Sequence, residues 1–361
     1  MSKLYNKKYD KKSLLQRVGD IRAIAGVRLM KFSDGPERNV RAAIFRTGSG
    51  FNFTVLLDRG MDIGLAEYNG IPLNWISSVG EASPAYYESD GINWLRNFHG
   101  GLLNTCGLTY AGAACEDNGV KLGLHGRASN TPAYNVSIFE EWKNNEYIFG
   151  ITGFIKETRV FGENIVLKRK ITCKLGEKKL LMEDTVENKG YSRTEHMLLY
   201  HINIGFPVVD EGSYIHTHAS SITPRDAEAV KGKEDYSKFT APVKDFKEKV
   251  YFHEMIPDKK GFVHAALINP KFEGKGLGVY IRYKKKEFPK FVEWKQMGEG
   301  TYVVGMEPAN CLVEGRDKDR KRGILQFLKP GEKRNYHMEI GVINSRKEIL
   351  TFLPKEKRDT L

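Results

Sequence analysis

The stretch EYIFGITGFIKETRVF, residues 146–161, is followed after two residues by NIVLKRKITCKL, residues 164–175. Both stretches are rich in β-branched and aromatic residues that alternate in part with polar ones, and Gly162 lies in the gap between them. This pattern is typical of β-strands that are joined by a turn. The two stretches therefore predict two consecutive strands.

Runs of the same kind occupy most of the chain, whereas helix signals are sparse. The runs lie at residues 51–64, 134–142, 179–190, 196–209, 277–283, 290–297, 301–308 and 323–343. Short helices are expected only near residues 12–24 and 94–98. Strands without intervening helices favour antiparallel sheets, so we expect an all-β fold, a sandwich or a barrel.

The composition excludes several classes of function. The chain has 361 residues and a net charge of +12, but its lysine runs are interleaved with acids, and no nucleic-acid-binding motif is present. No apolar stretch approaches the roughly 18 residues of a membrane helix, and the N-terminus has no secretory h-region. We therefore expect a cytoplasmic protein that binds neither nucleic acid nor membrane.

The four cysteines and the carboxylates give no sign of a metal site. The cysteines, Cys106, Cys115, Cys173 and Cys311, lie far apart and lack metal-ligand spacing. In a reducing compartment they are most simply free thiols. We expect no cofactor. A bound cation among the carboxylates stays open, although no cluster with metal spacing argues for one.

No linker divides the chain, so we expect one domain over residues 1–361. A short N-terminal extension is expected at about residues 1–16. The most polar segment, about residues 226–249, has strand patterns on either side and is interpreted as a surface insertion.

Three ionisable residues stand in apolar or glycine-rich surroundings. They are His125 in GLHGR, His201 in LLYHINIGFP and Glu307 in YVVGMEPAN. His201 shares a strand face with Leu199 and Asn203, which fits a core histidine as well as a polar pocket floor. Glu307 is either an exposed residue at a strand end or a buried group whose raised pKa suits a general base.

Weaker candidates cluster around glycines and one aromatic residue. In GLHGRASNTPA, residues 123–133, the turn needs only its Gly, Asn and Pro residues, so His125 and Arg127 require another explanation. The further candidates are Arg59, Arg96, His99, Asn104, Trp294 and Lys295. We expect Asp58, Arg59 and Asp62 to form an ion pair that stabilises the turn in which they lie.

The motifs GLHG, LLYHINIGFP and GMEPAN, in this order, resemble those of the aldose 1-epimerase (galactose mutarotase) superfamily. LLDRGMDIG, FHGGLLNTCGL and LHGRASNTPA make the chain most similar to an uncharacterised, DUF4432-type branch, and the resemblance covers roughly residues 17–343. It implies a galactose-mutarotase-like β-supersandwich whose concave face holds a sugar. It also implies an enzyme that interconverts α and β anomers without a cofactor.

The resemblance assigns roles by motif. Glu307 corresponds to the general base, His201 to the general acid at the ring oxygen, and His125 to a histidine that helps hold the sugar. A positioned acid or base contributes about 10² to 10⁴-fold, which suits a reaction that also proceeds unaided. The partner is then a small-molecule sugar. The sequence leaves the oligomeric state open, with a homodimer as one alternative.

The chain departs from the family pattern at GGLLNTCGL, which lacks the arginine that galactose mutarotases usually carry upstream of their LHGG histidine. Arg127 could replace it, and Arg59, Arg96 and Arg127 could together accept an anionic sugar, because guanidinium groups match phosphate, sulfonate or carboxylate. Two alternatives stay open: a carbohydrate-binding or sensing protein without turnover, and a different sugar isomerase, epimerase or lyase on the same fold.

Overall fold

The strands predicted around residue 150 form the longest hairpin of the molecule. The structure, a computed structural model, describes residues 2–352. Strand β12 (Glu146–Thr158) pairs antiparallel with β13 (Asn164–Lys174), with Ile151 opposite Ile171. Side chains alternate between the two faces of each strand, so Ile151 and Ile155 are both fully buried. The predicted strand pair is confirmed.

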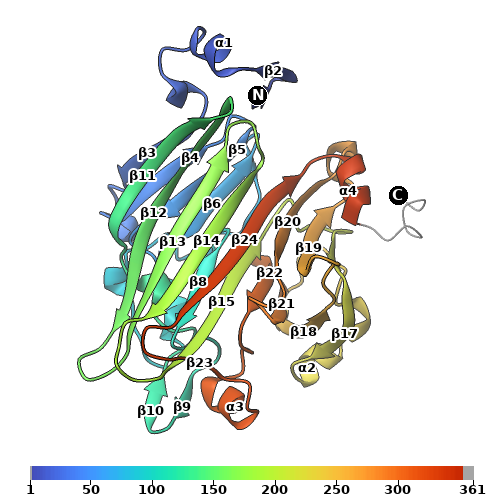
Figure 1. Cartoon of the computed structure of the whole chain (residues 1–361). Helices are drawn as coiled ribbons and strands as arrows, with labels where there is room; N and C mark the ends of the chain where they lie inside the picture. Colours follow the sequence, from blue (N-terminus) through green and yellow to red (C-terminus); the bar gives the residue numbers. More distant parts are fainter. Residues whose placement is uncertain (1, 353–361) are drawn as a thin grey trace.

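This hairpin belongs to an antiparallel sheet of eight strands (Figure 1). In spatial order the strands are β11 (Tyr134–Lys143), β12, β13, β14 (Lys179–Asn188), β24 (Lys333–Ile343), β20 (Leu277–Lys284), β19 (Phe262–Asn269) and β16 (Tyr214–Thr217). The chain enters this sheet at Tyr134 and returns to it with β24, which pairs with both β14 and β20.

A second sheet carries the residues of the candidate site. Its strands follow the order β17 (Ala219–Pro224), β18 (Lys249–Met255), β21 (Lys290–Gly298), β22 (Thr301–Ala309), β15 (Thr194–Ile204) and β23 (Gln326–Leu328). Strand β8 (Asn104–Leu108) pairs with β15. Segments that are far apart in the sequence are thereby placed side by side.

A third sheet and the core complete the sandwich. Strands β3 (Gly26–Lys31), β4 (Arg41–Arg46), β5 (Phe51–Leu56), β6 (Asp62–Tyr68) and β7 (Ile71–Pro72) form an antiparallel meander. Two small hairpins, β1 (Ser2–Leu4) with β2 (Lys7–Tyr9) and β9 (Cys115–Asp117) with β10 (Val120–Leu122), lie outside it. One buried hydrophobic cluster contains residues of all three large sheets, including Phe53, Phe149 and Ile202. The predicted all-β fold of large antiparallel sheets is therefore confirmed.

The α-helices are short, and they lie between strands or, in one case, after β24. The α-helices are α1 (Lys11–Leu15), α2 (Ala227–Val230), α3 (Arg316–Lys321) and α4 (Arg346–Phe352). The two short helices expected near residues 12–24 and 94–98 correspond to α1 with a 3-10 turn at Ile21–Ala23, and to the 3-10 helix η4 (Asn93–Asn97). Within residues 2–352, no helix is long and apolar enough to cross a membrane.

Candidate active site

His201 and Glu307 face each other across two paired strands. His201 lies on β15 and Glu307 on β22, between the paired positions Leu199 with Ala309 and Ile202 with Met306. The Nε2 atom of His201 is 3.2 Å from Oε1 of Glu307, and both residues are buried. The two ionisable residues that the sequence singled out on separate strands are therefore in direct contact.

Gly305 has no side chain, and this leaves room for the contact between His201 and Glu307. A Cβ atom at this position would lie 2.6 Å from Oε1 of Glu307 and 3.2 Å from Cε1 of His201. Any side chain here would therefore displace the pair. Steric constraints therefore explain why the GMEPAN motif has a glycine two residues before its glutamate.

The pair opens onto a small cavity of about 290 Å³. His125 lines the same cavity, so the three residues that stood out in the sequence meet at one place. The other lining residues are Ile92, Trp94, Leu95, Phe98, Ala113, Leu124, Arg225, Glu248, Val250, Trp294 and Val313. Most of them are apolar or aromatic, as is common for sites that bind small molecules.

The loop GLHGR brings His125 to the cavity through an unusual backbone conformation. His125 has a φ of +59°, and Gly126, at +75°, would place a Cβ atom 2.3 Å from the carbonyl oxygen of Tyr110. The N–H of His125 donates to the carbonyl of Gly112 at 2.9 Å. The His125 ring then lies 4.8 Å from the ring of Trp94 and 5.8 Å from that of His201. Gly126 thus shapes the loop that holds His125.

Burial favours the uncharged forms of these groups. Desolvation raises the pKa of Glu307 well above its ordinary value, and the negative charge of Glu248 adds to this effect. Desolvation lowers the pKa of His201 to about 3, with a further contribution from His125. It also lowers the pKa of His125 to about 4. Perturbed values of this kind are common among catalytic acids and bases.

Arg225 and Glu248 line the cavity but were not found from the sequence. Nη2 of Arg225 is 2.9 Å from Oε1 of Glu248, and Nε1 of Trp294 donates to the other carboxylate oxygen at 2.8 Å. Arg225 also pairs with Asp226 at 2.8 Å. Arg225 immediately precedes the segment interpreted as a surface insertion, and Glu248 lies in that segment. In the sequence, neither residue differs from an ordinary surface charge. Only the pairing of β17 with β18 brings them together.

Three other predicted residues lie behind the cavity. Asn203 donates from Nδ2 to the carbonyls of Gly100, Gly101 and His201, at 3.2, 3.1 and 3.0 Å. His99 and Asn104 are buried and contact each other, with 3.2 Å between Nδ1 and Nδ2. None of the three lines the cavity. They tie the Gly-Gly loop to strands β8 and β15.

The predicted arginines do not gather at the cavity. Arg59 is fully buried and donates to the carbonyls of Ala82 and Asn97 at 2.5 and 2.6 Å. Arg96 and Arg127 are exposed, and the Arg127 guanidinium lies 5.8 Å from the Tyr87 ring centroid.

Lys295, the neighbour of Trp294 on β21, points to the opposite face of its strand. There its Nζ donates to the carbonyls of Asp235 and Lys238 at 2.7 and 2.6 Å. None of the predicted cationic residues, Arg59, Arg96, Arg127 and Lys295, lines the cavity.

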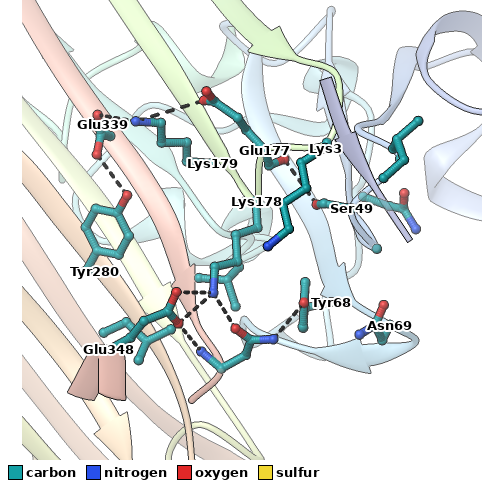
Figure 2. Close-up of a pocket in the computed structure, with 18 of the residues that line it drawn as sticks. Lys3, Ser49, Tyr68, Asn69, Glu177, Lys178, Lys179, Tyr280, Glu339 and Glu348 are labelled. Carbon is teal, nitrogen blue, oxygen red and sulfur yellow. Dashed lines mark hydrogen bonds and ion pairs between the residues drawn. The ribbon is translucent and has the colours of Figure 1, made fainter. Parts of the chain in front are cut away.

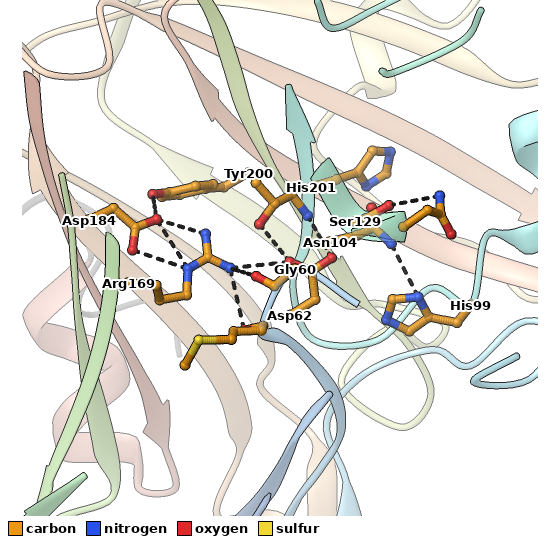
Figure 3. Close-up of polar contacts among 12 residues, drawn as sticks. Gly60, Asp62, His99, Asn104, Ser129, Arg169, Asp184, Tyr200 and His201 are labelled. Atoms are coloured by element: carbon orange, nitrogen blue, oxygen red, sulfur yellow. Dashed lines mark hydrogen bonds and ion pairs between the residues drawn. The ribbon is translucent and has the colours of Figure 1, made fainter. Parts of the chain in front are cut away.

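The predicted ion pair within the turn at residues 58–62 is wrong, because its acids pair with more distant arginines. Asp58 binds Arg41 at 2.6 Å. Asp62 contacts the fully buried Arg169 at 3.2 Å. Asp184 holds the same guanidinium at 2.7 Å, so Arg169 lies between two carboxylates (Figure 3).

The Arg169 network lies behind the strand of the candidate site. The hydroxyl of Tyr200 donates to Asp184. Tyr200 precedes His201 on β15 and therefore faces the other side of the sheet. The network fixes the strand that carries His201.

A wider groove of about 1090 Å³ lies between the N-terminal hairpin and α4 (Figure 2). Two of its lysines are paired with acids: Lys178 with Glu348 at 2.6 Å and Lys179 with Glu339 at 3.3 Å. Within residues 2–352, no group of three or more His, Cys, Asp or Glu side chains is placed to hold a metal ion. The cavity around His201 and Glu307 is therefore the candidate active site.

Comparisons with known proteins agree with this architecture. A family model described as a domain of unknown function, DUF4432, matches residues 37–342. A Klebsiella pneumoniae structure, provisionally described as an aldose 1-epimerase, is 23% identical over 92% of this chain and 87% of that one, with a TM-score of 0.86. No curated protein matches the chain.

Two further structures share the fold at lower identity. A galactose 1-epimerase from Lactobacillus acidophilus is 13% identical, with a TM-score of 0.57 over 89% of this chain and 99% of that one. A galactose mutarotase-like protein from Clostridium acetobutylicum is 12% identical, with a TM-score of 0.59 over the same shares of the two chains. At these identities the likeness concerns the fold.

Proposed function

Since the chain belongs to the DUF4432 family and has the galactose mutarotase-like fold, we propose that it is an aldose 1-epimerase that interconverts the α and β anomers of a free sugar. The observation that carries this proposal is the 3.2 Å contact between His201 and Glu307 at the wall of a small cavity. The cavity is also large enough for a monosaccharide and offers an aromatic surface, Trp294, for a sugar face.

The chemistry requires two proton transfers at adjacent oxygens. Opening a hemiacetal ring removes a proton from the anomeric hydroxyl and adds one to the ring oxygen. Both oxygens are bonded to the same carbon, so an acid and a base that lie side by side can reach both. Glu307 accepts the proton of the anomeric hydroxyl, and His201 donates one to the ring oxygen. The open carbonyl then rotates and closes on its other face, with the roles reversed.

Before a sugar binds, the pair is in its neutral form. Because burial raises the pKa of Glu307 and lowers that of His201, the shared proton rests on the carboxyl beside a neutral imidazole. A sugar hydroxyl that donates to Glu307 stabilises the carboxylate. The proton then crosses the 3.2 Å contact to Nε2 of His201, which becomes the acid. The pair needs one proton in total, and no metal or organic cofactor takes part.

His125 holds the sugar without taking a charge. With a pKa of about 4, its imidazole is neutral near pH 7. Nδ1 accepts from the N–H of Gly112 at 3.4 Å, so Nε2 carries the proton and can donate a hydrogen bond to a sugar hydroxyl.

Exchange NMR on a panel of reducing sugars tests the proposal. The wild type should accelerate anomer exchange, and Glu307→Gln and His201→Asn should each reduce kcat by about 10² to 10⁴-fold. Glu293→Gln is the matched control, because Glu293 forms a buried pair with His253, at 3.0 Å, outside the cavity. Equal activity in the wild type and both cavity variants, or no acceleration with any sugar, would contradict the proposal.

A further inference from the structure

The two ring nitrogens of His201 have different surroundings. Nε2 lies 3.2 Å from Oε1 of Glu307, at the wall of the cavity. Nδ1 is buried and has no hydrogen-bond partner within residues 2–352. Because buried polar atoms are rarely left unpaired, we expect a residue that can bind Nδ1 to lie beside it.

The proposed reaction determines which of the two nitrogens carries a proton. Before a sugar binds, Glu307 holds the shared proton and Nε2 of His201 is the acceptor. A neutral imidazole has one N–H group, which must then be at Nδ1. With the proton at Nε2 instead, His201 could not receive the proton of Glu307. An acceptor at Nδ1 is therefore required, because the partner of one ring nitrogen sets the protonation of the other.

Asn203 presents such an acceptor on the same strand. It lies two residues after His201 on β15, so both side chains point to the same face. Nδ2 of Asn203 donates to the carbonyls of Gly100, Gly101 and His201. A flipped amide would turn Oδ1 toward these three carbonyl oxygens, so the contacts fix its orientation. Oδ1 is then the free end of the amide, buried and without a partner among the described residues.

The Asn203 side chain also acts on the imidazole. Desolvation lowers the pKa of His201, and so does His125, whereas hydrogen bonding by Asn203 raises it. Asn203 therefore favours the charged imidazolium. A buried donor and a buried acceptor, each lacking another partner in the described part of the chain, thus lie next to each other behind the cavity.

On the basis of the proposed function, we infer that Asn203 is a positioning residue for His201. Oδ1 of Asn203 accepts a hydrogen bond from the N–H at Nδ1, which leaves Nε2 free to take the proton of Glu307. When that proton arrives, the imidazolium becomes a stronger donor, and the hydrogen bond to Asn203 tightens. Asn203 does not line the cavity, so it acts through His201 and not on the sugar.

Asn104 is the other amide that could bind Nδ1, and it provides a matched control. It lies opposite His201 on β8 and is equally buried. Its Nδ2 contacts Nδ1 of His99 at 3.2 Å, and its Oδ1 is likewise unpaired within residues 2–352. The groups that act on the pKa of His201 include Asn203 but not Asn104. The two asparagines therefore separate a role toward His201 from burial behind the same strand.

The position of the proton on His201 tests the inference directly. In protein labelled with ¹⁵N-histidine, NMR at pH 7 without sugar distinguishes protonated from unprotonated ring nitrogens, and His201→Asn identifies the signals of His201. We expect the proton at Nδ1 in the wild type and in Asn104→Ala. In folded Asn203→Ala, a substantial fraction should carry it at Nε2. A wild type with its proton at Nε2, or an unchanged proton position in Asn203→Ala, would overturn the inference.

Kinetics separate positioning from a general effect on structure. Folded Asn203→Ala should lose about 10- to 100-fold in kcat, in line with the loss of a hydrogen bond to a charged group, while KM stays within about twofold. Asn104→Ala should keep a kcat near that of the wild type. Equal losses in the two variants, or a change confined to KM, would contradict the role of Asn203. If the wild type accelerates exchange with no sugar, the proposed function fails, and the nitrogen signals still decide where the proton lies.

Discussion

Gly305 controls how closely His201 and Glu307 approach each other. In Gly305→Ala the new methyl group would lie 2.6 Å from Oε1 of Glu307, so the carboxyl must turn away from the imidazole. We expect kcat to fall by about 10²-fold, in line with the cost of a misplaced catalytic group. Exchange NMR with the best sugar measures this loss.

The control for this variant lies in the same hairpin. In Gly298→Ala the nearest atom to the new methyl group is Oε1 of the Gln296 side chain, 3.2 Å away, and the catalytic pair is not touched. Its kcat should stay near that of the wild type. Equal kcat values for folded Gly305→Ala and Gly298→Ala would show that the close contact has no part in turnover.

The pH dependence of the reaction reflects the pair rather than a free histidine. Because the pKa of His201 is lowered to about 3, a second proton joins the pair only in strong acid. We therefore expect kcat/KM to change by less than about twofold between pH 7 and pH 5. An unperturbed histidine would instead give a tenfold loss per pH unit below about 6.5.

The enzymatic part of the exchange rate, after the uncatalysed rate is subtracted, measures this profile. At high pH the pair loses its single proton, and activity ends. Because the pKa of Glu307 is raised, this alkaline limb of the pH profile lies at a higher pH than it would for an ordinary glutamate. An acid limb that begins near pH 6.5 would contradict the neutral starting form of the pair.

At the scale of elements, the buried Arg169 network fixes the strands behind the site. Arg169 on β13 is opposite Asp184 on β14, and both are buried. Asp184→Asn leaves the guanidinium without this charge partner, which should lower the free energy of unfolding by about 3 kcal/mol. Urea denaturation followed by circular dichroism measures the change.

The next residue pair on the same two strands is a matched control. Lys170 and Glu183 are also opposite each other and form an ion pair at 3.3 Å, but they are 44% and 48% exposed. Glu183→Gln should therefore cost less than about 1 kcal/mol. Similar losses in the two variants would mean that the buried network adds no more than a surface pair.

The strands themselves were predictable because their signals are local. In β12 and β13 the alternation of apolar and polar residues follows the two faces of the sheet. The turn at residues 58–62 was predicted less well. Its acids pair with Arg41 and Arg169, which lie 17 and 107 residues from their partners, and no local pattern encodes such contacts.

At the scale of the whole molecule, the motifs located His125, His201 and Glu307, and the structure brings these three to one cavity. The rest of the cavity depends on strand pairing between distant segments. Arg225 and Glu248 look like ordinary surface charges until β17 and β18 place them together. For the same reason Arg59, Arg96 and Arg127, which seemed suited to an anion, are not found at the cavity.

The central claim is that His201 and Glu307 move protons between oxygens and leave every carbon–hydrogen bond intact. The most direct test is proton NMR of a panel of reducing sugars in D₂O with catalytic amounts of the wild type. We predict α-to-β exchange at a rate proportional to enzyme concentration, with no loss of intensity at H2 or H5. Loss of a carbon-bound proton, or no exchange above the uncatalysed rate with any of these sugars, would contradict the account.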